Sequence, residues 1–372
     1  MGGPVRPRYH RLIGRKHKTP LKAGDECEME QIGMLIENGS YLWNNQGDRN
    51  DDETDARMNS DLKNLLQKVS RSFSLSLFAL PPQGRDFVGA TYLVARVADT
   101  LADSGRISTA SRLTHLQAWE NAICSRPSAK EKWKFNDSVG SFDHSEQQLL
   151  LESDRILKLF HQFPDEQKVL GQEVLAELTR GMNKIVQQVK GASFDQPIFI
   201  NSSTAEFDHY CYQHAGCVGP FWSRAFGLPA DLELFAIDYG KALERVNILR
   251  DVIEDRKRGR ILLAKDELEK FNLVGPEPWQ QEAWPNFVSE YVSRTKPFLQ
   301  HAANFCNAIP YRKWRLRFAS SLPLRIGLEC LKLYGAEKTK QETTKISRAK
   351  IKSIVWGGMA DTVIGRNVRG WS

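Results

Sequence analysis

Residues 247–255 read NILRDVIED, and within them Asp251 and Asp255 stand four positions apart. A second stretch, YLVARVADTLAD, ends at Asp103 and repeats the spacing with Asp99. Residues four apart on an α-helix share one face, so each stretch predicts a helix that presents two carboxylates side by side. The other positions are mostly aliphatic, which indicates that both helices are buried in an all-α protein.

Each aspartate pair belongs to a longer polar stripe on its predicted helix. Two carboxylates held together repel each other unless a cation lies between them, and a buried charged stripe is costly unless it faces an ion or a ligand. Hard divalent ions prefer oxygen ligands, so we expect Mg²⁺, with Mn²⁺ as the alternative, and a diphosphate as its remaining ligand. The expected metal ligands are Asp99, Asp103, Asn247, Asp251, Glu254 and Asp255, and Tyr92 and Arg96 extend the first stripe.

A single acidic pair at this spacing is more often a solvated feature of a surface helix. Two such pairs, each on an otherwise apolar helix and each beside an arginine, favour the metal interpretation. The pairs are about 150 residues apart in the sequence, which fits two halves of a helical bundle that face each other.

The charge and the hydrophobic content of the chain indicate which kinds of molecule it could bind. The chain has 372 residues, a formal net charge of +7 and 41% hydrophobic residues, as expected of a globular protein with an anionic partner. We find no nucleic-acid-binding motif, so a phosphorylated small molecule is favoured over nucleic acid. No stretch reaches the roughly 18 apolar residues that span a bilayer, and no secretory signal is evident. We therefore expect a cytoplasmic protein without a protein partner, and peripheral membrane contact is a further option.

The six cysteines form no CxxC pair and no regular framework, which favours reduced thiols. His209, Cys211, His214 and Cys217 resemble a zinc-binding set by residue type. If their segment is helical, His209 and Cys211 point in different directions and cannot bind one tetrahedral ion, so a packed helix is favoured over a zinc site.

Charge and periodicity divide the chain into an extension, a helical domain and a C-terminal part. Residues 1–58 begin with a basic arm and continue with acidic residues, which predicts a flexible extension; the arm could contact anionic lipid or be a solvated tail. Residues 59–335 predict one large helical domain. Helical patterns cover 149–162, 165–191, 205–227, 230–257, 283–308 and 312–334. Within them, Ala215, Gly216 and Gly219 allow either close helix packing or space for a long ligand beside the backbone.

Four linked motifs resemble those of the squalene/phytoene synthase family of head-to-head prenyl transferases. They are residues 70–73, 92–103, 210–219 and 247–260, in this order along the chain. The resemblance implies a single large isoprenoid-synthase helical bundle with a central cavity, in which both aspartate sets bind Mg²⁺. It also implies that two allylic diphosphates bind and that one of them ionises. The double bond of the other then attacks the cation to give a cyclopropyl diphosphate.

The resemblance also implies roles for individual residues. The expected catalytic residues are Tyr92, Arg96, Asp99, Asp103, Asp251 and Asp255. The residues expected to bind substrate are Ser70, Arg71, Phe73, Arg96, Tyr212, Gln213, Arg250 and Arg260. The guanidinium groups would hold diphosphate oxygens, and the ring of Tyr92 would offer a π-face to the carbocation.

The C-terminal part, residues 336–372, is expected to form a basic flap and tail. Residues 320–328 and 345–352 look like the C-terminal helix and the flap of squalene synthases, which carry the cyclopropyl intermediate on to squalene with NADPH. No Gly-rich dinucleotide fingerprint occurs in the chain, so scattered basic residues would have to bind NADPH. The candidates are Lys345, Arg348 and Lys350.

Two positions depart from the squalene synthase pattern. Gln213 stands where a tyrosine is usual, and Ala319 stands where a phenylalanine precedes the last core helix. The expected activity is the conversion of two farnesyl diphosphates to squalene, and a membrane surface is a candidate partner for product release. The alternatives are a presqualene diphosphate synthase, a phytoene or diapophytoene synthase, and a catalytically inactive scaffold or assembly factor of the same fold.

Overall fold

The computed structural model describes residues 57–70, 73–104, 107–125, 142–275, 277–336 and 346–370. Nearly all of the expected N-terminal extension therefore lies outside the described residues, as do Arg71 and Lys345. Within the described ranges, no helix is both long enough and apolar enough to cross a membrane.

The described part of the chain is built almost entirely from helices, which confirms the all-α prediction. The first half contains α2 (Ser60–Ser70), α3 (Phe73–Ala79), α4 (Pro82–Asp103), α5 (Thr109–Cys124), α6 (His144–Leu151), α7 (Ser153–Gln162) and α8 (Asp165–Gln188). The second half contains α9 (Thr204–Cys211), a π-helix (Tyr212–Gly216), α10 (Val218–Ala225), α11 (Glu233–Lys257), α12 (Lys265–Glu269), α13 (Trp284–Ala308), α14 (Trp314–Ala336) and α15 (Arg348–Val363). Short 3₁₀ turns occur at Ala230–Leu232, Pro278–Gln280 and Tyr311–Lys313.

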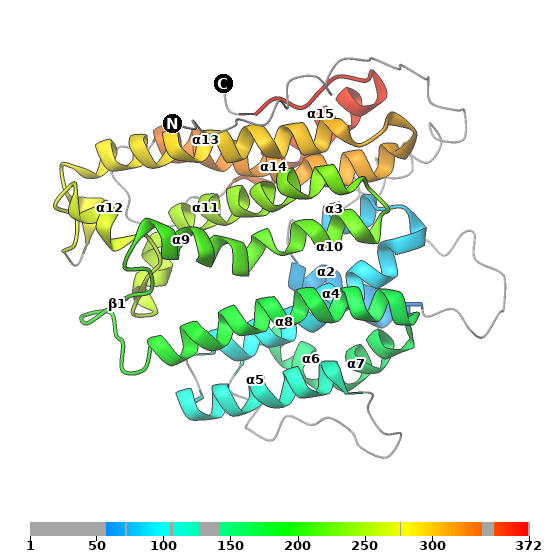
Figure 1. The fold of residues 1–372 in the computed structure, drawn as a ribbon, viewed down its shortest axis with the longest axis horizontal. Helices are drawn as coiled ribbons and strands as arrows, with labels where there is room; N and C mark the ends of the chain where they lie inside the picture. The colour runs from blue at the N-terminus through cyan, green and yellow to red at the C-terminus, as the bar shows by residue number, and fades with distance from the viewer. Residues whose placement is uncertain are drawn as a thin grey trace, which may run out of the picture.

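The helices form a bundle in which the two aspartate-bearing helices are central (Figure 1). Helices α13 and α14 lie along one edge, α11 lies beside them with α9 and α10, α4 and α8 follow, and α5, α6 and α7 lie along the opposite edge. Helix α4 is buried nearly all round, since Leu93, Val94 and Leu101 have no exposed surface. The apolar residues between the acids therefore pack into the core, as the sequence predicts.

A two-stranded parallel pair, β1 (Ile198–Phe199) with β2 (Arg260–Ile261), extends the end of α11. The chain turns there through Gly259, whose φ of 76° lies in the left-handed region, and a Cβ at this position would lie 2.7 Å from the backbone nitrogen of Ser193. Only glycine fits such a turn without strain. The turn places Arg260 next to the C-terminal end of α11.

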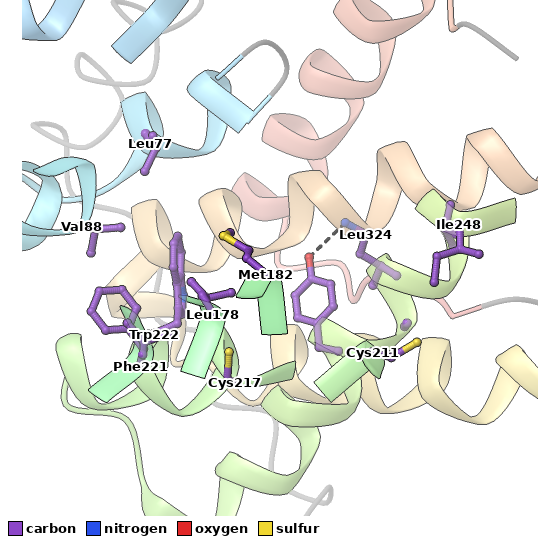
Figure 2. Packing of buried hydrophobic residues seen from close by; sticks show 14 of the residues in the cluster. Leu77, Val88, Leu178, Met182, Cys211, Cys217, Phe221, Trp222, Ile248 and Leu324 are labelled. Carbon is purple, nitrogen blue, oxygen red and sulfur yellow. Dashed lines mark hydrogen bonds between the residues drawn. The ribbon is translucent and has the colours of Figure 1, made fainter. Parts of the chain in front are cut away.

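The predicted helix over 205–227 is interrupted, because a π-helix separates α9 from α10. This segment packs against α11 at backbone distance: a Cβ on Gly219 would lie 2.3 Å from the carbonyl oxygen of Ala236, and one on Gly240 would lie 2.2 Å from that of Ala215. The close-packing interpretation of the small residues is therefore confirmed. Figure 2 shows Cys217, Phe221 and other side chains of the interrupted segment gathered in the core beside residues of α8 and α14.

Helix α14 is fastened to α11 at an internal proline. Pro323 has no N–H, and next to it the hydroxyl of Tyr239 is inserted into the helix. It accepts from the Leu324 N–H at 3.0 Å, the dashed line in Figure 2, and donates to the Ser320 carbonyl at 2.6 Å. The hydroxyl thus takes the place of the direct helical bond between these two buried backbone groups and gives each of them a partner. It also fixes α11 relative to α14.

The segment expected to form a basic flap contains α15, which packs on α14 through buried Val355 and Met359. Arg325 of α14 pairs with Asp361 at 2.9 Å. Beyond the helix, the chain is held by Arg317, whose guanidinium donates to Asn367 Oδ1 at 3.1 Å.

Adding a methyl group at Gly240 should separate α11 from the π-helix and destabilise the protein. We expect Gly240→Ala to lower the free energy of unfolding by about 1–3 kcal/mol, because an overpacked contact forces the backbone apart. The matched control is Gly357→Ala in α15, where no atom lies within 4 Å of the added Cβ. There the better helix propensity of alanine should raise stability by about 0.5–1 kcal/mol. Urea denaturation of both variants measures the difference, and equal stabilities would contradict the packing argument.

Candidate functional site

The face of α4 that carries the first aspartate pair is polar and partly open. Arg96 forms an ion pair with Asp99 three residues later on the helix, and the Asp99 side chain keeps 38% of its exposure. Tyr92, one turn before Arg96, contacts Phe73 of α3 with ring centroids 5.2 Å apart. The predicted stripe of phenol, guanidinium and carboxylates therefore exists, and an aromatic pair lies at one end of it.

The face of α11 repeats this arrangement in part. Arg250 pairs with its neighbour Asp251, with Nε 2.8 Å from Oδ1. Asp255 is nearly buried. Glu254, which the sequence predicts as a further ligand, is half exposed and pairs with Lys257 at 2.9 Å, so this ion pair lies outside the two aspartate pairs.

Arg260 brings the two helices together. Its NH1 lies 2.8 Å from Oδ1 of Asp103 on α4, and its Nε lies 2.9 Å from Oδ1 of Asp255 on α11. Arg258 adds a second contact to Asp103, at 2.7 Å from Oδ2. Carboxylates that are 152 residues apart in the sequence thus converge on one guanidinium group. This single contact joins the two predicted motifs into one site.

The pKa values of these groups follow from burial and from their arginine partners. Burial and the nearby charge of Asp103 raise the pKa of Asp99, and burial likewise raises the pKa of Asp255 despite Arg260. Burial alone would raise the pKa of Asp103 too, but Arg260 and Arg258 outweigh it and hold the pKa below its ordinary value. These carboxylates are desolvated and yet keep part of their surface exposed, so a charged ligand can still reach them.

The side chains predicted to bind a divalent ion can be judged by the chemistry of their donor atoms. The predicted ligands supply carboxylate and amide oxygens only, which suit Mg²⁺ or Mn²⁺. Among the described residues, no three or more His, Cys, Asp or Glu side chains are grouped closely enough to hold a metal ion. The acids instead form pairs that meet on the guanidinium of Arg260. Their chemistry therefore fits a hard cation, and in this structure the positive charge at the meeting point belongs to an arginine.

The π-helix lies against both α8 and α11, beside this site. Gln213 is buried and donates to Glu177 Oε1 of α8 at 3.2 Å, while Tyr212 is partly exposed and stacks with His209. Short π-helical segments inside α-helices are frequent at functional sites. The ring of His214 stacks on that of Tyr210, so the two histidines of the considered zinc set face different tyrosines.

Other predicted residues lie in varied surroundings. Ser70 is buried, and its hydroxyl donates to the Leu66 carbonyl of its own helix. Arg348 is exposed, and Lys350 pairs with Glu329 at 2.9 Å. Asn247 lies half-buried on α11, between the acid that precedes it and the second aspartate pair.

Sequence reasoning missed Glu244 and Arg258. Glu244 precedes Asn247 by three positions and Asp251 by seven, so it extends the polar face of α11 by one turn. Burial raises the pKa of Glu244 to about 7. Continuing the helical spacing backwards from Asn247 would have found this residue. No local spacing identifies Arg258, because it reaches Asp103 only through the fold.

Comparisons with known proteins give one consistent family. A family profile described as squalene/phytoene synthase matches residues 66–350. The squalene synthase of Eremothecium gossypii is 25% identical over 311 residues, which cover 76% of this chain and 64% of that protein. The squalene synthase of Homo sapiens is 28% identical over 241 residues, or 62% and 49% of the two chains. The chain thus spans about half to two thirds of the length of the curated relatives it matches.

Solved structures share the fold. The complex structure of TcSQS with the ligand E5700 superposes with a TM-score of 0.67 at 20% identity, over 82% of this chain and 88% of that one. A dehydrosqualene synthase in complex with a ligand gives a TM-score of 0.53 at 20% identity, over 81% and 96%. At this identity the likeness establishes the fold alone, an all-α isoprenoid synthase bundle.

Removing the guanidinium of Arg260 should destabilise the metal-free protein. Arg260→Met leaves Asp103 and Asp255 close together without their shared cation, and we expect a loss of about 1–3 kcal/mol at pH 7 because the site is partly open to solvent. The matched control is Lys257→Met, which breaks only the exposed pair with Glu254 and should change stability by less than about 0.5 kcal/mol. Chemical denaturation in the presence of a chelator measures both values.

The deficit of Arg260→Met should also depend on pH. In the wild type the lowered pKa of Asp103 contributes stability above its unfolded value near 4, and this contribution is lost as the pH falls through the folded value. In the variant burial opposes ionisation of both carboxylates, so the deficit should be largest at pH 7 and should shrink toward pH 4. A deficit that is constant with pH would contradict the ion-pair account.

Proposed function

The chain belongs to the squalene/phytoene synthase family, and from this premise we propose that it condenses two farnesyl diphosphates head to head, through presqualene diphosphate, to squalene. The observation that carries the proposal is the convergence of Asp103 and Asp255 on Arg260. Acids and arginines in one site suit a diphosphate together with divalent cations, because both signs of charge are then compensated.

The chain's own residues would hold the diphosphate end of the substrate. Asp99, Asp103, Asp251 and Asp255 would hold Mg²⁺, which when bound supplies Lewis-acid neutralisation of the departing diphosphate. Without the metal, the carboxylates are neutralised by Arg96, Arg250, Arg258 and Arg260. Carboxylates that bind an ion no longer need these partners, so the guanidinium groups are placed to bind diphosphate oxygens.

The residues around the stripe would protect the carbocation. The contacting rings of Phe73 and Tyr92 lie one turn from Arg96, where their π-faces can stabilise positive charge without reacting. The apolar residues of α4 pack around the stripe and would exclude water that quenches the cation.

Among the described residues, the basic side chains suggested for NADPH do not come together in one dinucleotide-binding site. Lys350 is engaged by Glu329, Arg348 lies exposed at the first turn of α15, and Lys345 is outside the described residues. The reductive step remains part of the proposal on the strength of the squalene synthase relatives.

One observation favours a second candidate, a presqualene diphosphate synthase that stops after the first condensation. Gln213 occupies the position where the family resemblance predicts a tyrosine, and its amide is bound to Glu177. A phytoene or diapophytoene synthase, which needs no reductant, is the further enzymatic alternative. A catalytically inactive scaffold is disfavoured, because desolvated aspartates such as Asp103 and Asp255, which converge on Arg260, are costly to keep in a chain without metal chemistry.

Product analysis separates these candidates. Purified protein supplied with farnesyl diphosphate and Mg²⁺ should give squalene only when NADPH is present. Presqualene diphosphate in both conditions would indicate the half-reaction enzyme, and a conjugated triene without reductant would indicate a carotenoid-type synthase. Absence of product, with geranylgeranyl diphosphate as well, would favour the scaffold.

Substitution of one aspartate from each motif should abolish the first condensation. We expect Asp99→Asn and Asp251→Asn each to lower the rate of presqualene diphosphate formation at least about 100-fold, since each removes a ligand charge at the reacting diphosphate. The control is Asp165→Asn at the start of α8, an aspartate whose side chain is 92% exposed. The thermal shift caused by Mg²⁺ with a diphosphate should also be lost in the first two variants. Wild-type rates in either would refute the metal assignment.

A further inference from the structure

Helix α15 has apolar residues on two faces, but the bundle covers only one of them. Val355, Met359 and Thr362 are buried against the rest of the protein. Trp356, on the flank of this buried face, is 39% exposed, and Ile364, just after the helix and on the side away from it, is 55% exposed. Most exposed large apolar residues of the described chain are isolated, whereas these two belong to one face.

The exposed positions follow the helical period. Lys352, Trp356, Ala360 and Ile364 are four residues apart and all exposed, so they form one outward stripe. Gly357 lies beside Trp356, and nothing lies within 4 Å of the position its Cβ would take. Among the described residues, the outward stripe is therefore exposed, and the position next to Trp356 has no neighbour within 4 Å.

Basic residues surround this stripe at both ends. Residues 346–370 contain five Lys or Arg residues and one acid. The acid, Asp361, is already paired with Arg325 and Arg366. Exposed Arg348 lies at the start of the helix, and exposed Arg369 lies beyond its end. The rim is thus positive on both sides of an apolar centre.

Neighbouring elements extend the same charge. Arg312 is exposed next to Tyr311, whose hydroxyl donates to the Gly365 carbonyl at 2.8 Å, so this arginine lies near the C-terminal end of α15. Lys332 is exposed one turn after Glu329, the partner of Lys350, and so lies near the other end. Positive groups from two further segments therefore border the stripe.

We infer that the outward face of α15 docks on an anionic lipid membrane. A tryptophan ring prefers the interface between lipid and water, and an interfacial helix places its apolar side chains below the headgroups while basic residues meet acidic lipids. The positive rim matches a negatively charged membrane surface by charge complementarity. The helix would lie in the plane of the membrane, because one side of it remains packed on α14.

The position of α15 in the bundle permits this contact. The helix lies at the edge formed with α14, on the opposite side of the molecule from α5, α6 and α7 (Figure 1). The aspartate helices lie between these edges. Docking through α15 therefore leaves the charged site and the remaining surface available, and the inference does not depend on which reaction the protein catalyses.

Vesicle binding of the full chain tests this inference. The wild type should float with vesicles of phosphatidylcholine and phosphatidylglycerol and bind vesicles of pure phosphatidylcholine much more weakly, with binding that falls as salt rises. Trp356→Ser combined with Ile364→Ser should lower the partition coefficient about tenfold or more, because both apolar anchors are lost. Because the Trp356 side chain is only 39% exposed, the melting temperature and the circular dichroism spectrum of the variant are measured as well, and binding is compared at a temperature at which the variant is fully folded.

A matched control separates this face from general stickiness. Leu151 of α6 is 70% exposed on the far edge of the bundle, and Leu151→Ser should leave vesicle binding unchanged. Failure of the wild type to bind anionic vesicles, or equal binding by the double variant, would overturn the inference. So would a concentration-dependent dimer in sedimentation that the double variant abolishes, because the occupant of the face would then be a second copy of this chain.

Discussion

Asp103 and Asp255 can lie close together because the guanidinium of Arg260 lies between them. Two like charges 4 Å apart repel by about 4 kcal/mol at the effective dielectric of a protein surface, which exceeds what one helix contact usually contributes. A shared arginine changes this repulsion into attraction, and Arg258 adds to it at Asp103. The guanidinium of Arg260 thus links α11 and the residues that follow it to α4 through two ion pairs.

The rest of the bundle holds α11 in the position this site requires. Glycines at 219 and 240 let the interrupted segment approach α11 at backbone distance, and the hydroxyl of Tyr239 joins α11 to α14 within the hydrogen-bond ladder of that helix. The turn at Gly259 then directs Arg260 back toward both aspartates. The glycines and the buried hydroxyl of Tyr239 thus fix the position of α11, and with it the positions of Asp255 and Arg260. Packing in the core therefore sets the geometry of the site.

The described part of the molecule has two distinct charged regions. The site between α4 and α11 combines acids with arginines, a balance that agrees with the proposed ligand of metal and diphosphate. The outer face of α15 combines basic residues with exposed apolar side chains and lacks an unpaired carboxylate among the described residues 346–370. The net charge of +7 indicated an anionic partner, and the two regions are two separate candidate surfaces for such a partner.

The sequence by itself determined the helical class, the extents of most long helices and the one-face placement of each aspartate pair, because these features depend on spacings of three and four residues. It did not predict the π-helix, the half-exposed pairing of Glu254 with Lys257, or the role of Arg258, and it ended the polar face of α11 one turn too early at Asn247. Only the tertiary structure decided that the two motifs meet on Arg260 and that Trp356 and Ile364 stay exposed among the described residues. The physical reason is that helical periodicity is local, whereas the contact of charges 152 residues apart depends on how the whole bundle packs.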